Sequence, residues 1–307
     1  MGVSKDGQPV PPGLLKVLDG TVDLHCHSGP SPFPRRINHV EASYDAARIG
    51  VRALLVKSHH HNTVMDLLAM GPWLKEAPTP VYGGVALNSE VGGINPSAVA
   101  MSLRMGGRCV WAPTVSARQH IEHHSHEHGF PTSGLDLLES EVSVFDDSGS
   151  VSAQTEQVVE VVADADALLT GGHLDADSMK ALFTVAVDKG VRRLLVQHPD
   201  FIVGASDGDI EELLRMGAYV EHEIAMYHPG VPKPGWPIEQ LVRWIERVGP
   251  ERTTIGSDLG QQGNPLPVDG YIYLVQCLLD HGVSEKDVRR MIAGNPAYLL
   301  GLEDSPS

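Results

Sequence analysis

The sequence alternates short apolar segments with longer segments of helical pattern, and this alternation constrains the fold more than any other feature. The apolar segments have the length of strands, and glycine or proline punctuates the chain between them and the helical segments. Strands that alternate with helices form parallel βαβ units, and eight such units make a (β/α)8 TIM barrel. Nearly continuous apolar strands also fit a sheet that is buried on both faces. We therefore expect an α/β fold, a (β/α)8 TIM barrel, with a doubly wound open sheet as the alternative.

The expected strands and helices follow each other along the whole chain. The predicted strands are residues 21–24, 52–56, 81–87, 108–112, 167–169, 193–196, 218–221 and 253–255. The predicted helices are residues 40–49, 63–70, 95–105, 154–163, 178–189, 208–216, 238–248, 268–281 and 285–293. Residues 1–307 are therefore predicted to form a single domain.

One polar segment, residues 115–150, interrupts the alternation after the fourth strand. It is rich in histidine, with a predicted hairpin at residues 142–151. Its histidines are His120, His123, His124, His126 and His128. A stretch of this length without helix–strand alternation is typical of a functional loop or a lid. We predict an insertion that shapes substrate choice and covers the site.

Composition excludes several classes of function. The chain has 23 basic and 39 acidic residues, a formal net charge of −16, so a surface for nucleic acid or anionic lipid is not expected. No apolar run is long enough to span a membrane, and the first 20 residues do not have the pattern of a signal peptide. Three cysteines make no disulfide framework, which favours the cytoplasm. The expected partner is a small-molecule substrate; a homo-oligomer stays open.

Many of the 16 histidines lie where predicted strands end. In a parallel barrel the carboxyl ends of all strands lie on one rim, so side chains far apart in the sequence converge there. Histidine is the commonest metal ligand in proteins, which makes this rim a candidate metal site. The polar residues at the strand ends are His25 and His27, Lys57 and His59, Asn88 and Glu90, His173, His198, Glu221 and His222, and Asp258.

The local spacing supports this interpretation. Residues i and i+2 of an extended segment point the same way, so His25 and His27 present two imidazoles to one point. A catalytic divalent ion takes three or four such ligands at about 2.0–2.2 Å and leaves one position open for water. His25, His27, His173, His198 and Asp258 suffice for one ion and most of a second. A ligand that bridges the two ions would complete the pair of sites. Lys57, if carbamylated by CO₂, or Glu90 would supply it, and we favour Lys57.

The motifs resemble those of the amidohydrolase superfamily of metal-dependent hydrolases. The matching pieces are DLHCHSGP at the first strand, GGHL at the fifth, QHP at the sixth, GSDLGQ at the eighth and GNPAYLLGL in the closing helix. Within the superfamily the chain is similar to an uncharacterised branch with Lys-x-His after strand two, LNSEVGGINP after strand three and VWAPT at strand four. The usual bridging lysine lies on strand four, whereas residues 109–114 contain none, which leaves the bridge and the number of ions open.

The resemblance implies a role for each strand-end residue. His25 and His27 would hold the more buried ion, and His173 and His198 the second. Asp258 would contact the first ion and take the proton from the attacking water, with His198 as a further catalytic residue. His59 is expected to be a ligand as well. His120, Glu90 and His222 are candidates for contact with the substrate. Zinc is the expected metal, with manganese as the alternative.

The predicted reaction is attack by a metal-activated water on a C–N or C–O bond of an amide, lactam, ester or lactone. Three alternatives remain at this stage. One is a phosphoesterase of the polymerase-and-histidinol-phosphatase type, which also has a histidine pair in a DLHxHS context. The second is a decarboxylase or other lyase on the same metal scaffold. The third is a barrel that binds a metal or ligand without catalysis.

Overall fold

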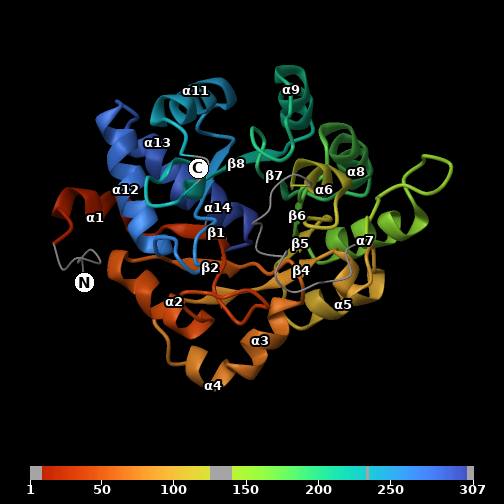
Figure 1. Ribbon diagram of the computed structural model, residues 1–307, viewed down its shortest axis with the longest axis horizontal. Coiled ribbons are helices and arrows are strands. Elements are labelled where there is room, and N and C mark those ends of the chain that lie inside the picture. Colours follow the sequence, from red (N-terminus) through yellow and green to blue (C-terminus); the bar gives the residue numbers. More distant parts are fainter. Residues whose placement is uncertain (1–8, 125–139, 233–234, 303–307) are drawn as a thin grey trace. The chain divides into compact units, whose positions relative to one another are not determined.

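The computed structural model of the protein describes residues 9–124, 140–232 and 235–302, and its helices and strands are labelled in Figure 1. The chain forms two compact units. Unit 1 contains residues 1–57, 65–82 and 221–307, and unit 2 contains residues 58–64 and 83–220. Two elements, α3 (Thr63–Ala69) and β8 (Tyr219–Glu223), have residues in both units.

Unit 1 is built on parallel strands that carry the histidine pair of the sequence. The strands β1 (Val22–Cys26), β2 (Ala53–Val56) and β3 (Val81–Tyr82) pair in this order. The strand β9 (Thr253–Gly256) runs beside β1, and the end of β8 neighbours β9. Every residue of β1, β2 and β9 is buried, which explains why these segments are nearly continuous apolar runs.

Unit 2 contains a second run of parallel strands. The strands β4 (Gly84–Ala86), β5 (Cys109–Trp111), β6 (Leu168–Thr170) and β7 (Leu194–Val196) pair in sequence order. The first two residues of β8 continue this ladder, since Leu195 and Val196 pair with Tyr219 and Val220. All residues of β4 to β7 are buried. The eight predicted strands are therefore confirmed in position and in parallel direction.

The third predicted strand, residues 81–87, is divided in two at Gly83. Its first part, β3, pairs with β2, and its second part, β4, pairs with β5. The two glycines at the break have close neighbours within unit 2. A Cβ on Gly83 would lie 2.6 Å from Thr63 Oγ1, and a Cβ on Gly84 would lie 2.1 Å from the carbonyl oxygen of Cys109. Only glycine fits there without moving these neighbours.

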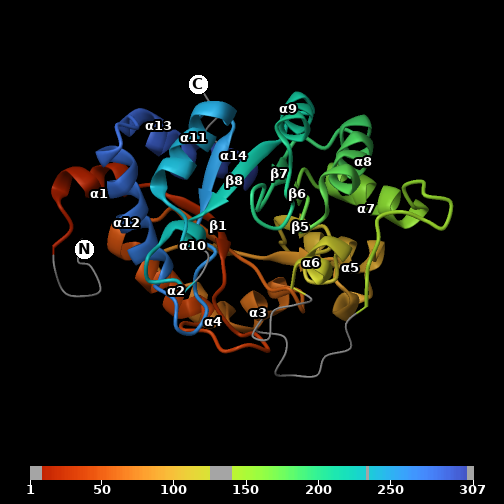
Figure 2. The ribbon, with the colours of Figure 1, turned by 45° about the horizontal axis from the view of Figure 1, so that its top comes forward.

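The helices of unit 1 cover its strands with apolar faces. In α11 the buried residues Ile238, Leu241, Ile245 and Val248 recur at helical spacing. Helix α1 lies beside α12 in both views (Figures 1 and 2). The helices of this unit are α1 (Pro12–Leu18), α2 (His39–Ala46), η1 (Ala47–Ile49), α4 (Gly71–Leu74), α10 (Ile224–Tyr227), α11 (Ile238–Val248), α12 (Pro267–Asp280), α13 (Glu285–Arg289), the π-helix η4 (Arg290–Gly294) and α14 (Asn295–Leu299).

The helices of unit 2 begin at well-defined caps. Ser206 and Asp209 form a capping box at the start of α9, and the Asp175 side chain accepts a hydrogen bond from the backbone of Ser178 at the start of α8. Such caps satisfy amide groups that have no partner inside the helix. The helices of this unit are η2 (Ser89–Val91), α5 (Pro96–Arg104), α6 (Arg118–His124), α7 (Ala153–Asp164), α8 (Ala176–Asp188) and α9 (Asp207–Arg215).

The predicted insertion, residues 115–150, lies partly outside the described residues. Residues 125–139, with His126 and His128, belong to the part that is not described. The insertion begins with α6, a short helix that the sequence analysis missed because its pattern is polar and only His120 is buried. The predicted hairpin is confirmed by an antiparallel bridge between Phe145 and Val151. Four further short helices, α1, α4, α10 and α14, were also missed as separate elements, since so few turns leave a weak periodic pattern.

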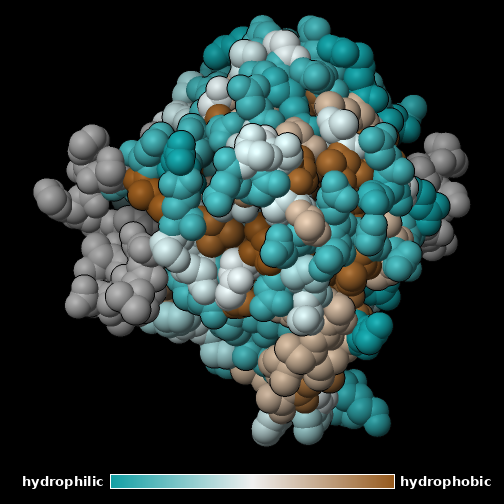
Figure 3. All heavy atoms as spheres, turned by 90° about the vertical axis from the view of Figure 1, so that its right-hand side faces the viewer, coloured by the Kyte–Doolittle hydropathy of each residue, from teal (hydrophilic) through white to brown (hydrophobic). Residues whose placement is uncertain are grey.

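Hydrophilic residues predominate on the face shown in Figure 3, where hydrophobic areas are interrupted by polar ones. The most exposed large apolar side chains are Tyr44, Met65, Leu68 and Trp73 in unit 1 and Met101, Met105 and Val187 in unit 2. Among the described residues, none of the helices combines the length and the apolar character needed to cross a membrane.

Candidate metal centre

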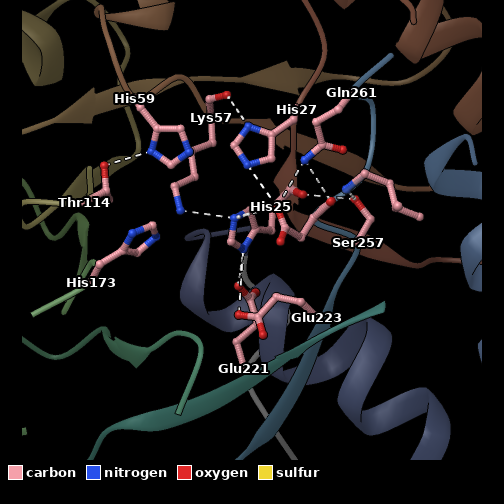
Figure 4. Close-up of polar contacts among 12 residues, drawn as sticks. His25, His27, Lys57, His59, Thr114, His173, Glu221, Glu223, Ser257 and Gln261 are labelled. Carbon is pink, nitrogen blue, oxygen red and sulfur yellow. Dashed lines mark hydrogen bonds and ion pairs between the residues drawn. The ribbon is translucent and has the colours of Figure 1, made fainter. Parts of the chain in front are cut away.

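The histidine pair at the end of β1 converges with Asp258 inside unit 1. The Nε2 atoms of His25 and His27 lie 3.5 Å and 3.1 Å from Oδ1 of Asp258. The two imidazoles are buried, and their ring centroids lie 5.2 Å apart. One ligand atom from each of the three residues falls within 4.8 Å of the others. Figure 4 shows the rings of both histidines close together, as the i, i+2 spacing predicts.

Backbone hydrogen bonds place Asp258 at this point. The amide of Asp258 donates to the carbonyl of His25 at 2.8 Å, and the Ser257 hydroxyl donates to the same carbonyl at 3.0 Å. The buried carboxylate of Asp23 accepts from the amides of both His25 and Ser257, at 3.0 Å and 2.9 Å. Asp23 therefore ties the end of β1 to the loop after β9. Burial raises the pKa of Asp23, while these hydrogen bonds lower it.

The hydrogen bonds of the two imidazoles determine which nitrogens face Asp258. Nδ1 of His27 lies 3.1 Å from the carbonyl oxygen of Lys57, and a carbonyl only accepts, so Nδ1 carries the proton. Nδ1 of His25 donates in the same way to Glu221 Oε1 at 2.9 Å. Both Nε2 atoms then present lone pairs towards Asp258, which is the arrangement of metal-ligating histidines with second partners that orient them. Burial lowers the pKa of His27 to about 4, so this ring is neutral at neutral pH.

The donor set fits a divalent cation. Three ligand atoms about 2.1 Å from a tetrahedral ion lie about 3.4 Å from one another. The observed separations from Asp258 Oδ1, 3.1 Å and 3.5 Å, are close to this value. Two lone pairs that face one carboxylate oxygen also repel each other unless a cation or a proton lies between them. Two imidazoles and a carboxylate suit zinc or manganese.

Lys57 and Glu223 complete the surroundings of His25. Lys57 is buried, and its Nζ lies 3.1 Å from Nε2 of His25 (Figure 4). Oε1 of Glu223 lies 4.0 Å from Nδ1 of His25, beside the closer Glu221. Glu221 and Glu223 are two residues apart in β8 and therefore share a face. This part of unit 1 therefore buries a lysine, two carboxylates and an imidazole close to one another.

Two predicted site residues have an unusual backbone conformation. Asp258 has φ 49° and His198 has φ 50°, and Asp166 is the one other non-glycine residue of the described chain with positive φ. This left-handed conformation is unfavourable for residues with a side chain and is retained where the surroundings enforce it. At Asp258 the bond from its amide to His25 and one from Gln261 Nε2 to its carbonyl oxygen, 3.1 Å, hold the backbone. Asp166, outside the predicted site residues, shares this conformation, so it reflects local constraints on the backbone.

Unit 2 brings four of the predicted histidines together. The rings of His59 and His173 have centroids 5.6 Å apart, and those of His173 and His198 are 5.1 Å apart. His120, from α6, stacks on His173 at 4.8 Å, and the Nδ1 atoms of the two rings lie 2.8 Å apart. His120, His173 and His198 are buried. His120 is thus a histidine of the predicted insertion that joins this cluster, and the ring of His124, also in the insertion, lies 4.4 Å from that of His120.

A buried asparagine holds His59 in place. Asn88 Nδ2 donates to the carbonyl of His59 at 2.7 Å and to Thr114 Oγ1 at 2.6 Å, while its Oδ1 accepts from the amide of Thr114 at 2.7 Å. The hydroxyl of Thr114 also lies 2.8 Å from Nδ1 of His59 (Figure 4). Glu90, the other predicted residue of this strand, bonds through Oε1 to Nδ1 of His60 at 2.8 Å. His60 and Glu90 therefore form a pair of their own.

A serine, a histidine and an aspartate also meet in unit 1, but in a different arrangement from a nucleophilic triad. Ser28 Oγ lies 2.7 Å from Nδ1 of His39, and Nε2 of His39 lies 3.7 Å from Asp66. The second distance is too long for a hydrogen bond. Ser28 and His39 are buried, with 1% and 0% of their surfaces exposed. The trio connects the loop after β1 to α2 and α3.

The structure thus distributes the predicted residues over both units. Unit 1 contains His25, His27, Lys57, Asp258 and His222, and unit 2 contains His59, Glu90, His120, His173 and His198. His222 points to α11, where its ring lies 5.3 Å from that of Trp244. Sequence reasoning considered Glu221 among the strand-end residues and assigned no site role to Asp23, Glu223 and Ser257. The i, i+2 spacing of Glu221 and Glu223 in a buried strand is the signal that could have identified these two residues.

We predict that a methyl group at Gly256 disrupts this centre. A Cβ there would lie 2.7 Å from Cδ of Glu221 and 2.9 Å from Cβ of His25, so one of these buried side chains must shift. Gly256→Ala should destabilise the fold by about 1–3 kcal/mol, the usual cost of overpacking. Urea unfolding measures this. The control is Gly13→Ala in α1, where a Cβ meets nothing within 4 Å. Equal stability of the two variants would contradict the packing described.

Comparison with known proteins gives one family and many similar folds. The sequence matches the family described as a family of unknown function (DUF6282) over residues 20–221. No curated protein matches the sequence. Among solved structures, an amidohydrolase from Pseudomonas aeruginosa is 14% identical with a TM-score of 0.64; the match covers 94% of this chain and 98% of that one.

Two further solved structures have the same fold. A dipeptidase AC, a metallopeptidase of family M19, is 13% identical, with a TM-score of 0.58 and coverage of 92% of this chain and 98% of that one. The phosphotriesterase homology protein from Escherichia coli, solved with phosphate in its active site, is 17% identical, with a TM-score of 0.54 and coverage of 92% and 99%. These likenesses confirm the expected (β/α)8 TIM-barrel fold and the resemblance to the amidohydrolase superfamily at the level of fold.

Proposed function

We propose that this chain, which belongs to the DUF6282 family, is an enzyme: a metal-dependent hydrolase whose ion is held by His25, His27 and Asp258. The observation that carries the proposal is the convergence of two imidazole Nε2 atoms and one carboxylate oxygen on a single point. Solved structures of this fold include a protein titled amidohydrolase and one titled metallopeptidase, which supports a hydrolytic function. When bound there, a divalent ion would lower the pKa of water towards about 7.

The residues of unit 1 have separate tasks in this proposal. His25 and His27 hold the ion through Nε2, and Glu221 and the Lys57 carbonyl keep each ring in the required tautomer. Asp258 accepts the proton of the attacking water at its carboxylate and delivers it to the leaving nitrogen or oxygen. The side chain of Asp258 is 14% exposed, so it is open to a substrate while the two histidines are covered.

The substrate bond that we propose is a C–N or C–O bond of an amide, lactam, ester or lactone. Zinc is the proposed metal. Lys57, as a carbamate formed by its Nζ and CO₂ with loss of one proton, is the proposed further ligand, because its Nζ lies 3.1 Å from His25 Nε2 within unit 1. Glu90 is less suited to this role, since its carboxylate is engaged by His60 in unit 2. His173 and His198, with His59, remain the proposed ligands of a second ion.

The test combines metal analysis with a substrate panel. Protein purified without added metal should contain a transition metal and should hydrolyse at least one amide, lactam, ester or lactone, with activity lost on chelation and restored by zinc or manganese. Hydrolysis of phosphomonoesters alone would instead support the phosphoesterase alternative. Release of CO₂ without hydrolysis would support a lyase. Protein that holds no transition metal even after metal has been added would refute the proposal of a metal-dependent hydrolase.

A further inference from the structure

The loop that follows the histidine pair carries an arginine to the edge of the proposed centre. Arg35 and Gln261 form an antiparallel bridge within unit 1. On either side of it, the amide of Arg36 donates to Gly260 at 2.8 Å, and that of Gln262 donates to Pro34 at 3.1 Å. The segment that contains Asp258 therefore continues to Gln261, which pairs with Arg35 through the backbone. Figure 4 shows Gln261, the partner of Arg35, within hydrogen-bonding reach of this segment.

Arg35 differs from two other partly buried arginines of unit 1, Arg36 and Arg48. Arg48 forms ion pairs with Asp45 and Asp269, and Arg36 donates to the carbonyl of Asn264 at 2.6 Å. The side chain of Arg35 makes no ion pair and no hydrogen bond with any described residue, and its Nε is buried. A guanidinium has five N–H donors, and leaving them unpaired away from water is unfavourable. Among the described residues, Arg35 is therefore a cation whose buried Nε has no hydrogen-bond acceptor.

The charge of Arg35 acts on the proposed centre. It contributes to the lowered pKa of His27, although burial is the larger cause. Burial also lowers the pKa of Arg35 itself, while the negative charge of Asp258 raises it. Geometry agrees with this placement: a Cβ on Gly29, two residues after His27, would lie 3.3 Å from Cβ and 3.4 Å from Cγ of Arg35. The side chain of Arg35 therefore lies against the segment that follows His27, while its backbone pairs with Gln261 after Asp258. In a chain with a net charge of −16, such a cation offers a local site for an anion.

We propose that Arg35 binds an anionic oxygen group of the substrate, a carboxylate or a phosphate, and so selects acidic substrates for this centre. The planar guanidinium donates two parallel hydrogen bonds to either group, which uses the donors that the protein leaves open. The selection of substrates rests on the proposed function. Binding of the anion does not, because it can be measured without turnover. Arg35 would then be a specificity-determining residue for the reaction.

Isothermal titration calorimetry with three related probes tests the inference. Benzoate and phenylphosphonate carry the two anionic groups, and benzamide is the uncharged isostere of benzoate. The protein as purified should bind at least one anion about tenfold or more tightly than benzamide, since hydrogen bonds between charged groups are roughly twice as strong as neutral ones. Arg35→Gln should abolish this preference. Arg35→Lys should retain part of it, because lysine keeps the positive charge but cannot donate two parallel hydrogen bonds from a planar group. The control is Arg118→Gln, an exposed arginine of unit 2 paired with Glu141.

The outcomes separate the inference from the proposed function. An anion preference that persists in Arg35→Gln would place the anion on the metal or elsewhere and overturn the inference, as would a wild-type protein with no preference. Preference for benzoate or for phenylphosphonate decides between a carboxylate and a phosphate. Metal content of each variant is measured in parallel, and a loss of anion preference with unchanged metal supports Arg35 as the binding group. Should one of the two Arg35 variants not fold, the other decides.

Discussion

Replacing His25 by alanine is expected to remove the metal from the protein and to abolish hydrolysis. His25 contacts three residues around the centre, since its Nε2 faces Asp258 and Lys57 and its Nδ1 bonds to Glu221. Loss of a partner that merely orients a ligand costs about 10- to 100-fold in metal affinity, and loss of the ligand itself should cost more. Elemental analysis of protein purified in parallel measures the metal directly.

The control for this variant is His281→Gln, because His281 lies at the end of α12 with a side chain that is 36% exposed. Its metal content should equal that of the wild type. His25→Ala also leaves the buried carboxylate of Glu221 without its imidazole, which destabilises the fold. His27→Ala gives a second measurement if the first variant does not fold. A full metal complement in either folded variant would contradict the proposed centre.

Replacing Asp258 by asparagine is expected to lower kcat by a factor of about 10²–10⁴ while most of the metal stays bound. Asparagine keeps an oxygen at the position of Oδ1, near the Nε2 atoms of His25 and His27. It cannot accept a proton at neutral pH, so the proposed transfer from water to the leaving group is lost. Steady-state kinetics and elemental analysis on one preparation separate the two effects.

The matched control for this variant is Asp166→Asn. Asp166 shares the positive φ of Asp258, but it belongs to unit 2, and its carboxylate pairs with Arg192 and Arg193. Its loss should reduce stability and leave kcat unchanged. Asp258→Asn with wild-type kcat would exclude Asp258 as the proton carrier, and Asp258→Asn without metal would restrict its role to that of a ligand.

Sequence patterns predicted the strands well because most of them are buried along their length and are therefore largely apolar. They also predicted that His25 and His27 face one way, since the period of two is a property of any extended chain. The short helix α6 was missed because about two polar turns show little periodicity. Hydrophobicity likewise gave no indication of the break at Gly83, which depends on the close neighbours Thr63 and Cys109.

The sequence by itself determined the parallel α/β architecture and the kinds of side chain that end its strands, because burial and backbone alternation act locally. The tertiary structure alone decided the partners: Glu221 for His25, the Lys57 carbonyl for His27, and Asp23 as the link between the ends of β1 and β9. It also decided that Arg35 pairs with Gln261 beside the centre, with an Nε that no described residue accepts from. These contacts join residues up to 234 positions apart, and no local pattern encodes the direction of a hydrogen bond between distant segments.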